Sequence, residues 1–176
     1  MQARNDDEVK AMIIPGLRDT VDYVVQKIWN DNRELVREIV YAAYSPVEYA
    51  RTGDFKEAWD TDVSSGGSAV QGVFKYAPDL MSPHTSMWSG EDIREGLAEI
   101  IYQGLAGDFT GKYKYASENP SFAGQAWTGG RNAWARLKKE LGKRKLKSYF
   151  TAGLRANGIK FKDRRAALIV REFDEK

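Results

Sequence analysis

The chain has 176 residues, of which 42% are hydrophobic, 12% aromatic and 30% charged, and it contains no cysteine. A chain of this length buries roughly 70% of the surface that its unfolded form exposes, so a folded core is expected. The absence of cysteine excludes disulfides, thiolate catalysis and cysteine-ligated zinc. No apolar run approaches the roughly 18 residues of a membrane-spanning helix, and the polar residues 1–10 predict no signal peptide. We therefore expect production inside a cell and no membrane partner.

The formal net charge of +2 conceals an asymmetry along the chain. Residues 1–130 carry 12 Lys and Arg against 20 Asp and Glu, a net −8, whereas residues 131–176 carry 15 against 5, a net +10. The basic end either faces DNA or an acidic partner, or is a solvated helix face that complements the acidic remainder of the protein. In an assembly, the same asymmetry suits contacts between the acidic face of one subunit and the basic face of the next.

The first periodic pattern predicts a long helix from about Asp19 to Tyr44. Asp19 or Thr20 can cap its start, and Pro15-Gly16 separates it from a leading segment, residues 1–17, that we expect to be mobile. Its apolar residues recur every three or four positions and form one stripe: Val21, Val24, Val25, Ile28, Trp29, Leu35, Val36, Ile39, Val40 and Ala43.

Alternating side chains then predict a β-hairpin. Trp59, Thr61 and Val63 share one strand face, and residues 69–77 return after the turn Ser65-Gly66-Gly67-Ser68. The tip at Gly66 and Gly67 is interpreted either as a partner-binding loop or as an ordinary flexible turn.

Three further helices are predicted after the hairpin. The first follows Ser89 and Asp92, which resemble a capping box; its apolar stripe runs from Ile93 to Ile101, and Gly104 ends it. Apolar spacing places the others at about residues 131–141 and 143–157, with Gly142 as a break and Gly158 as the residue that ends the last helix. The tail at 174–176 is expected to fray. The sequence therefore predicts a single α+β domain over residues 1–176: a small, mostly antiparallel sheet packed by a long N-terminal helix and three or more further helices.

Residues 105–130 show no sustained period and are predicted to form a long loop. Loops of this length in a compact domain are usually functional or contact-forming. Its rings either supply contact area for a partner or fix the loop to its own domain. They are Phe109, Tyr113, Tyr115, Phe122 and Trp127.

Few residues are suited to catalysis or metal binding. His84 is the single histidine; it can be grouped on paper with Ser86 and Asp79, but no Gly-x-Ser-x-Gly elbow surrounds any serine, so we interpret His84 as a turn residue. The acidic residues lack the spacing of a calcium loop. Gly107 to Lys112 has too few residues between its glycines for a phosphate loop. We expect no catalytic residue, no metal site and no cofactor.

A cluster of cations between residues 138 and 147 is the strongest remaining signal. Enough positive charge lies there for several phosphate contacts, which supports an alternative function as a nucleic-acid-binding accessory protein. No set of base-reading side chains accompanies the cluster, so only non-specific contact with DNA is expected. Its members are Lys138, Lys139, Lys143, Arg144, Lys145 and Lys147.

A tyrosine-framed segment follows the first helix: Tyr44-Ser45-Pro46-Val47-Glu48-Tyr49-Ala50-Arg51-Thr52-Gly53. Pro46 moves Ser45 out of the helical region of backbone space and so ends the helix, and Gly53 can turn the chain into a new short element. We interpret the segment as a rigid corner in which Tyr44 and Tyr49 pack against the hairpin while Arg51 remains available to pair with an acid.

This Tyr-x-Pro-x-x-Tyr-x-Arg-Thr segment, placed after an N-terminal helix, resembles one in neck or tail-completion proteins of tailed bacteriophages, which join head to tail. The order of the downstream elements is similar as far as about residue 160. The resemblance implies a non-enzymatic structural virion protein that is made in the host bacterial cytoplasm and assembles as a homo-oligomeric ring. It also implies portal (connector) or tail-tube proteins as partners.

Overall fold

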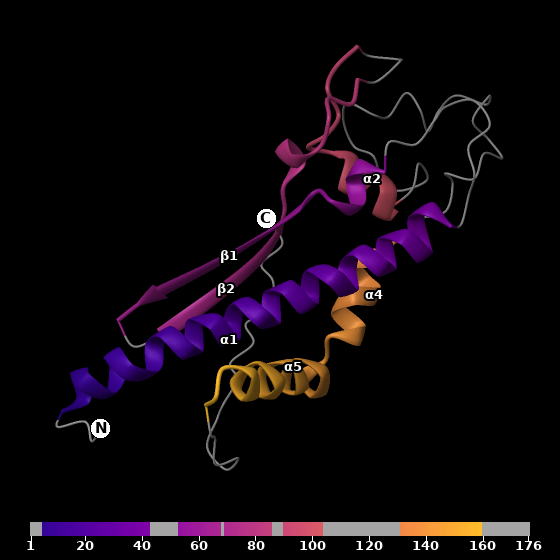
Figure 1. Ribbon diagram of the computed structural model, residues 1–176. Helices are drawn as coiled ribbons and strands as arrows, with labels where there is room; N and C mark the ends of the chain where they lie inside the picture. The colour runs from indigo at the N-terminus through magenta and orange to yellow at the C-terminus, as the bar shows by residue number, and fades with distance from the viewer. Residues whose placement is uncertain (1–4, 43–52, 68, 86–89, 104–130, 160–176) are drawn as a thin grey trace. The chain divides into compact units, whose positions relative to one another are not determined.

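A computed structural model describes residues 5–42, 53–67, 69–85, 90–103 and 131–159 (Figure 1). The predicted α+β class is confirmed, because a two-stranded sheet is combined with one long and several shorter helices. In chain order the elements are α1 (Asp6–Leu35), a π-helical turn (Val36–Tyr41), a 3-10 turn (Asp54–Lys56), β1 (Trp59–Gly66), β2 (Ala69–Tyr76), a second 3-10 turn (Pro78–Leu80), α2 (Leu97–Gln103), α4 (Ala133–Glu140) and α5 (Lys143–Ala156).

The chain divides into two compact units, each discontinuous in sequence. Unit 1 comprises Met1–Ile28, Thr61–Phe74 and Glu140–Lys176, and unit 2 comprises Trp29–Asp60 and Lys75–Lys139. Helix α1 and both strands contribute residues to each unit. The sequence prediction of one domain did not include this division.

Helix α1 begins at Asp6, well before the predicted start at Asp19. The Oδ1 atom of Asn5 accepts a hydrogen bond from the backbone N–H of Glu8 at 2.9 Å, so Asn5 caps the helix. Pro15 lies inside the helix even though proline removes one helical hydrogen bond. The sequence signal for the early start was Asn5 followed by the acidic run from Asp6 to Glu8.

The end of this helix is not a regular α-helix. Val36–Tyr41 forms a π-helical turn, and the backbone N–H of Ala42 donates to the carbonyl oxygen of Arg37, five residues earlier, at 2.9 Å. Val36 and Val40 are both buried. Val36 and Val40, four positions apart, therefore both face the core.

The predicted hairpin is confirmed by β1 and β2, which pair directly as neighbours. Along β1, Trp59 is buried and Thr61 and Val63 are half-buried, whereas Asp62 is exposed, as the alternation predicted. Gly53, with φ of 82°, adopts the left-handed conformation and begins the 3-10 turn that leads into β1.

In unit 1, two glycines allow close approach to α1. A Cβ atom on Gly72 of β2 would lie 2.7 Å from methyl groups of both Val21 and Val25. A Cβ atom on Gly153 of α5 would lie 3.1 Å from the side chain and the carbonyl oxygen of Thr20. The strand and the helix therefore pack on α1 at distances that larger residues do not permit.

Thr20 organises the contact between α1 and α5. Its side chain is fully buried, and its hydroxyl donates to the carbonyl oxygen of Gly16 at 2.7 Å. The amide of Asn157, just after α5, donates to the Thr20 hydroxyl at 3.4 Å. Sequence analysis interpreted Thr20 as a possible cap; the structure places it inside the helix.

Unit 2 is built around a cluster of aromatic rings. Phe55 contacts Trp59, Tyr76 and Tyr102, with ring centroids between 5.9 and 6.1 Å apart. Trp59 also stacks on Trp134 of α4. Trp29 of α1 donates from its indole N–H to the carbonyl oxygen of Trp59 at 3.0 Å, which ties the helix to the base of the hairpin.

The later helices agree with the sequence in place and order. Helix α4 starts after Asn132, whose Oδ1 accepts from the backbone N–H of Ala135 at 2.7 Å, and Gly158, with φ of 69°, follows α5 as predicted. Helix α2 starts at Leu97, later than the predicted start after Ser89, because a turn at 94–96 precedes it.

Candidate functional site: a cationic face on helix α5

Among the described elements, helix α5 carries the largest net charge. Its sequence, KRKLKSYFTAGLRA, contains five cations and no acid. Leu146, Gly153 and Leu154 are buried on its inner side. Because a helix turns every 3.6 residues, the residues opposite these three form an exposed outer side.

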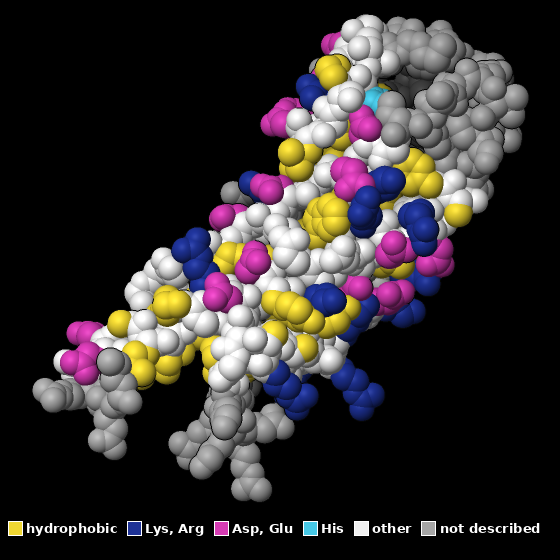
Figure 2. Space-filling model, viewed as in Figure 1, with side chains coloured by type: hydrophobic (Ala, Val, Ile, Leu, Met, Phe, Trp, Pro, Cys, Tyr) yellow, Lys and Arg dark blue, Asp and Glu magenta, His cyan; other side chains and the backbone are white. Residues whose placement is uncertain are grey.

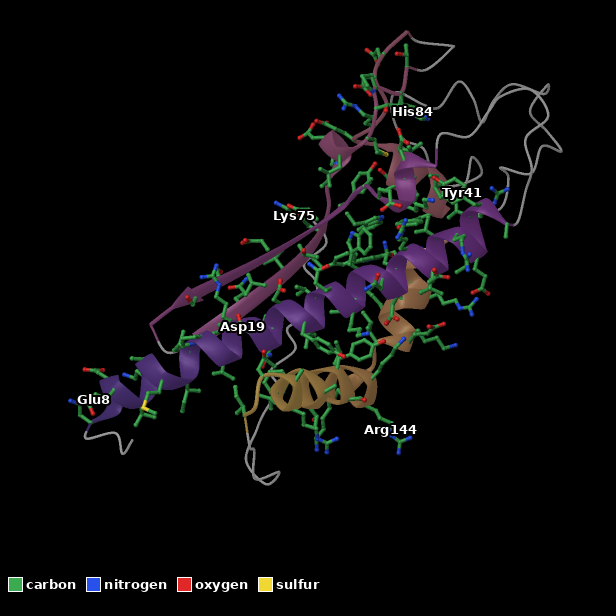
Figure 3. All side chains as sticks on the ribbon, viewed as in Figure 1. Glu8, Asp19, Tyr41, Lys75, His84 and Arg144 are labelled. Carbon is green, nitrogen blue, oxygen red and sulfur yellow. The ribbon has the colours of Figure 1, made fainter. Side chains whose placement is uncertain are left out.

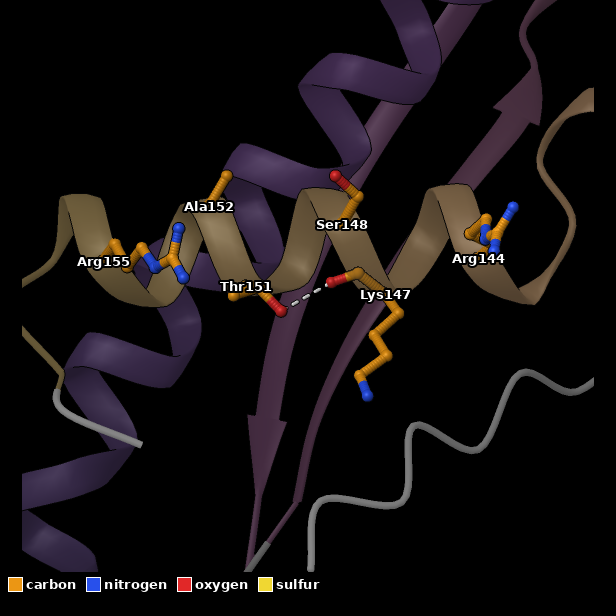
Figure 4. Close-up of a pocket in the computed structure, with 6 residues that line it drawn as sticks. All are labelled: Arg144, Lys147, Ser148, Thr151, Ala152 and Arg155. Carbon is orange, nitrogen blue, oxygen red and sulfur yellow. Dashed lines mark hydrogen bonds between the residues drawn. The ribbon is translucent and has the colours of Figure 1, made fainter. Parts of the chain in front are cut away.

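The outer side of α5 carries a polar face with a shallow hollow, which we name the α5 cationic face. Its members lie on successive helical turns, since they are separated by three or four residues except for the adjacent pair Lys147 and Ser148. The hollow has a volume of about 330 Å³, and Ala152 is its one apolar lining residue among those described (Figure 4). The face consists of Arg144, Lys147, Ser148, Thr151 and Arg155.

The cations of this face project away from the protein. Arg144, Lys147 and Arg155 are exposed, and Arg144 extends from the ribbon into solvent (Figure 3). Dark blue side chains mark α5 on the surface in Figure 2. The hydroxyl of Thr151 donates to the carbonyl oxygen of Lys147 at 2.8 Å, which fixes the hydroxyl oxygen within the hollow.

Four of the predicted cations belong to α5, but their surroundings differ. Arg144 and Lys147 lie on the α5 cationic face. Lys145 is half-buried: its Nζ lies 4.0 Å from Glu140 and 5.7 Å from the ring centroid of Tyr149. Its charge is therefore largely committed within unit 1. Lys143 is exposed but does not line the hollow.

The first turn of α5 opposes the helix dipole. Lys143, Arg144 and Lys145 occupy this turn, and no acid accompanies them. The amino end of a helix carries a partial positive charge, so each cation near it costs roughly 0.3–1 kcal/mol when exposed. Because these cations destabilise the helix, their presence indicates a role other than helix stability.

Lys138 and Lys139 have a different explanation. They lie in the last turn of α4 and belong to unit 2, where the partial negative charge at the carboxyl end of a helix stabilises cations. The six cations predicted as one cluster are thus divided. Sequence analysis also missed Ser148, Thr151 and Arg155, although their spacing from Arg144 along the predicted helix was a usable signal.

His84, the residue considered for catalysis, contributes its backbone to a turn. Its N–H donates to Asp92 at 3.4 Å, and its carbonyl oxygen accepts from Ile93 at 2.8 Å. Asp92 also accepts from the backbone N–H of Arg94 at 3.1 Å and from its Nε at 2.7 Å. The backbone hydrogen bond from Arg94 is the main reason that the pKa of Asp92 is lowered. The expectation of a chain without catalytic residues stays a prediction.

Most predicted contact residues lie outside the described part of the chain. Gly66 and Gly67 are within it and are exposed at the hairpin tip. The corner at residues 43–52, the loop at 104–130 and the tail at 160–176 are not described. The undescribed candidates are Tyr44, Tyr49, Arg51, Phe109, Tyr113, Tyr115, Phe122 and Trp127.

Two further kinds of site are absent from the described residues. No group of three or more His, Cys, Asp or Glu side chains there is arranged to hold a metal ion. Within the same ranges, no helix combines the length and the apolar character required to cross a membrane.

The structure thus defines an α+β chain with a cationic helix face. The chain belongs to the YomN family, whose sequence model matches residues 6–156, from the first residue of α1 to the last residue of α5. It is 26% identical over 122 residues to the SPbeta prophage-derived uncharacterized protein YomN of Bacillus subtilis (strain 168), covering 67% of this chain and 76% of that protein. No solved structure matches the chain.

Proposed function

We propose that this chain is a structural virion protein of a tailed phage, forming part of the head–tail neck or of a tail-completion ring without catalysing a reaction. The carrying observation is the family match over residues 6–156, together with a relative that is named as prophage-derived. The Tyr44 to Thr52 segment, which resembles that of neck and tail-completion proteins, supports the same role.

An exposed apolar strip on α1 supports assembly into a homo-oligomer. Val9, Met12 and Ile13 are 39%, 55% and 43% exposed, and their spacing puts them on one side of the helix. Adjacent large apolar side chains on a surface often mark protein contacts. In the proposed ring, a second copy of the chain covers this strip. Portal or tail-tube proteins contact the ring at other surfaces.

The virion is the proposed location, and its composition tests the proposal. Mass spectrometry of purified particles is expected to find the protein in several copies per particle. Particles produced without the gene are expected to contain filled heads that lack joined tails. Infectious particles of normal appearance from the deletion would contradict the proposal.

The corner offers a sharper variant of this experiment. Complementation with Arg51→Ala is expected to lower the yield of joined particles, because Arg51 is proposed to pair with an acid on a partner. Lys75→Ala is the matched control, since Lys75 is an exposed cation whose nearest acid is Asp60 at 3.9 Å in its own unit. Equal yields from both variants would remove Arg51 from the proposed interface.

A further inference from the structure

We infer that the α5 cationic face binds the phosphodiester backbone of nucleic acid without reading its sequence. This inference is independent of the proposed virion role, because it depends only on the residues of α5. It differs from the sequence-based alternative in its residues: Ser148, Thr151 and Arg155 are included, whereas Lys138, Lys139 and Lys145 are not.

The side chains of the face are those that contact phosphates. Arg, Lys and Ser donate hydrogen bonds to phosphate oxygens and carry no base information, whereas the hydroxyl proton of Thr151 is already donated to the carbonyl oxygen of Lys147. No acid occurs in α5, so nothing on this helix repels a polyanion. Base reading is favoured by Asn, Gln or a set of arginines pointed into a groove, and the hollow has no Asn or Gln among its described lining residues.

The dimensions also suit a backbone. Arg144 and Arg155 are separated along α5 by about 16 Å, at roughly 1.5 Å per residue. Duplex DNA carries one negative charge per about 1.7 Å of axis, so the face spans several phosphates. The hollow has a volume of about 330 Å³, which leaves room for phosphate groups between the two arginines.

Two observations favour an external anion over a partner within this chain. Arg144 and Arg155 form no ion pair with any described residue, unlike Lys145, which has Glu140 nearby. The unfavourable cations of the first turn are also stabilised once an anion binds beside them. A positive face whose two arginines form no ion pair with a described residue therefore fits a polyanionic ligand.

The salt dependence of binding gives a quantitative test. Three cations of the face are expected to release about three counterions, so the logarithm of the association constant should fall with the logarithm of salt concentration with a slope of about −2.7. Fluorescence anisotropy with two duplexes of unrelated sequence is expected to give equal affinities, with the full-length protein in about 50 mM salt.

The decisive variant is Arg144→Ala/Arg155→Ala, and its matched control is Lys10→Ala/Lys75→Ala, which removes the same charge from exposed lysines elsewhere. The first should flatten the slope by about two, and the control should keep the wild-type slope. Thermal melts should agree among the three proteins, because alanine is a good helix former at these exposed sites.

Three results overturn the inference. These are an absence of DNA retention by the wild-type protein in low salt, equal losses in the two double variants, and displacement of DNA by polyglutamate at the same charge concentration. The last result would assign the face to an acidic protein surface. None of these three results bears on whether the protein is found in purified particles, so this inference and the proposed function can fail separately.

Discussion

The indole rings of Trp59 and Trp134 stack with centroids 5.4 Å apart and planes inclined by 13°. Trp59 begins β1 and Trp134 lies in α4, so the stack joins the base of the hairpin to a helix far along the sequence. Within unit 2, the stack continues a ring cluster that includes Phe55 and Tyr102. The position of α4 in this unit therefore depends on aromatic packing.

Replacing Trp134 with alanine is expected to destabilise the protein by about 1–2 kcal/mol, because a large, half-buried ring is lost from the cluster. Trp134→Phe keeps a ring and should cost less than half as much. Chemical denaturation followed by circular dichroism measures both. A Trp134→Ala protein as stable as wild type would show that the stack does not hold α4.

Asn32 is a second test of unit 2. Its side chain is fully buried in α1, and neither Oδ1 nor Nδ2 has a hydrogen-bond partner in the described structure. A buried polar group without a partner costs about 1–3 kcal/mol. Leucine has a similarly branched side chain, so Asn32→Leu is expected to raise the free energy of unfolding by about 1 kcal/mol or more.

The control for Asn32 is Asn30→Leu, which changes an exposed asparagine of the same helix. It is expected to alter stability by no more than about 0.5 kcal/mol. Denaturation midpoints of the two variants, compared with that of the wild type, measure both changes in stability. A loss of stability in Asn32→Leu would mean that the Asn32 amide makes a stabilising interaction that is absent from the described contacts.

Stability should fall at alkaline pH because of Tyr76 and Tyr102. Burial raises the pKa of both phenols above the ordinary value of 10.0. The folded protein therefore keeps them neutral while the unfolded chain ionises, so the stabilisation is complete below about pH 10 and decreases as pH rises above it. Denaturation between pH 8 and about 11 measures this slope.

Phenylalanine variants separate the two tyrosines. The hydroxyl of Tyr76 donates to the carbonyl oxygen of Arg94 at 2.6 Å, so Tyr76→Phe should cost about 1 kcal/mol at neutral pH. The buried hydroxyl of Tyr102 has no partner in the described structure, so Tyr102→Phe should cost nothing there. Each variant should flatten the alkaline slope; an unchanged slope in both contradicts the assignment.

Gly72 tests the approach of the hairpin to α1. Valine normally suits a strand, but here its side chain collides with Val21 and Val25, which lie 2.7 Å from the position of a Cβ atom. Gly72→Val is expected to cost about 1–3 kcal/mol. Gln71→Val, at an exposed neighbouring position, should be neutral or slightly stabilising, and equal thermal melts for the two variants would refute the close contact.

The sequence predicted the elements whose signals are local. The hairpin, α4 and α5 followed from alternation, helical spacing and the glycines at 142 and 158. The start of α1 was wrong because Pro15 was given more weight than the cap at Asn5, although the surrounding helix accommodates the proline.

Other features depend on tertiary contacts that spacing does not encode. The partnership of Trp59 with Trp134 joins segments distant in sequence. The burial of Asn32, in contrast, could have been predicted, because Asn32 lies four residues from both Ile28 and Val36 on the apolar stripe. The division of the six cations required the helix ends and the neighbours of Lys145, namely Glu140 and Tyr149. Arg155 could have been found by extending the helical spacing of Arg144 by three turns.

The π-helical turn at Val36–Tyr41 has a consequence for variation in length. A π-turn holds one residue more than the matching α-helical turn, so deleting a residue from it permits a continuous α-helix. Each residue of an α-helix corresponds to a rotation of about 100°. The wider π-turn absorbs the rotation of its extra residue, so such a deletion preserves the helix and leaves Ala42 facing nearly as before. The turn is therefore a place where the helix can gain or lose one residue while the residues on either side of it keep their direction.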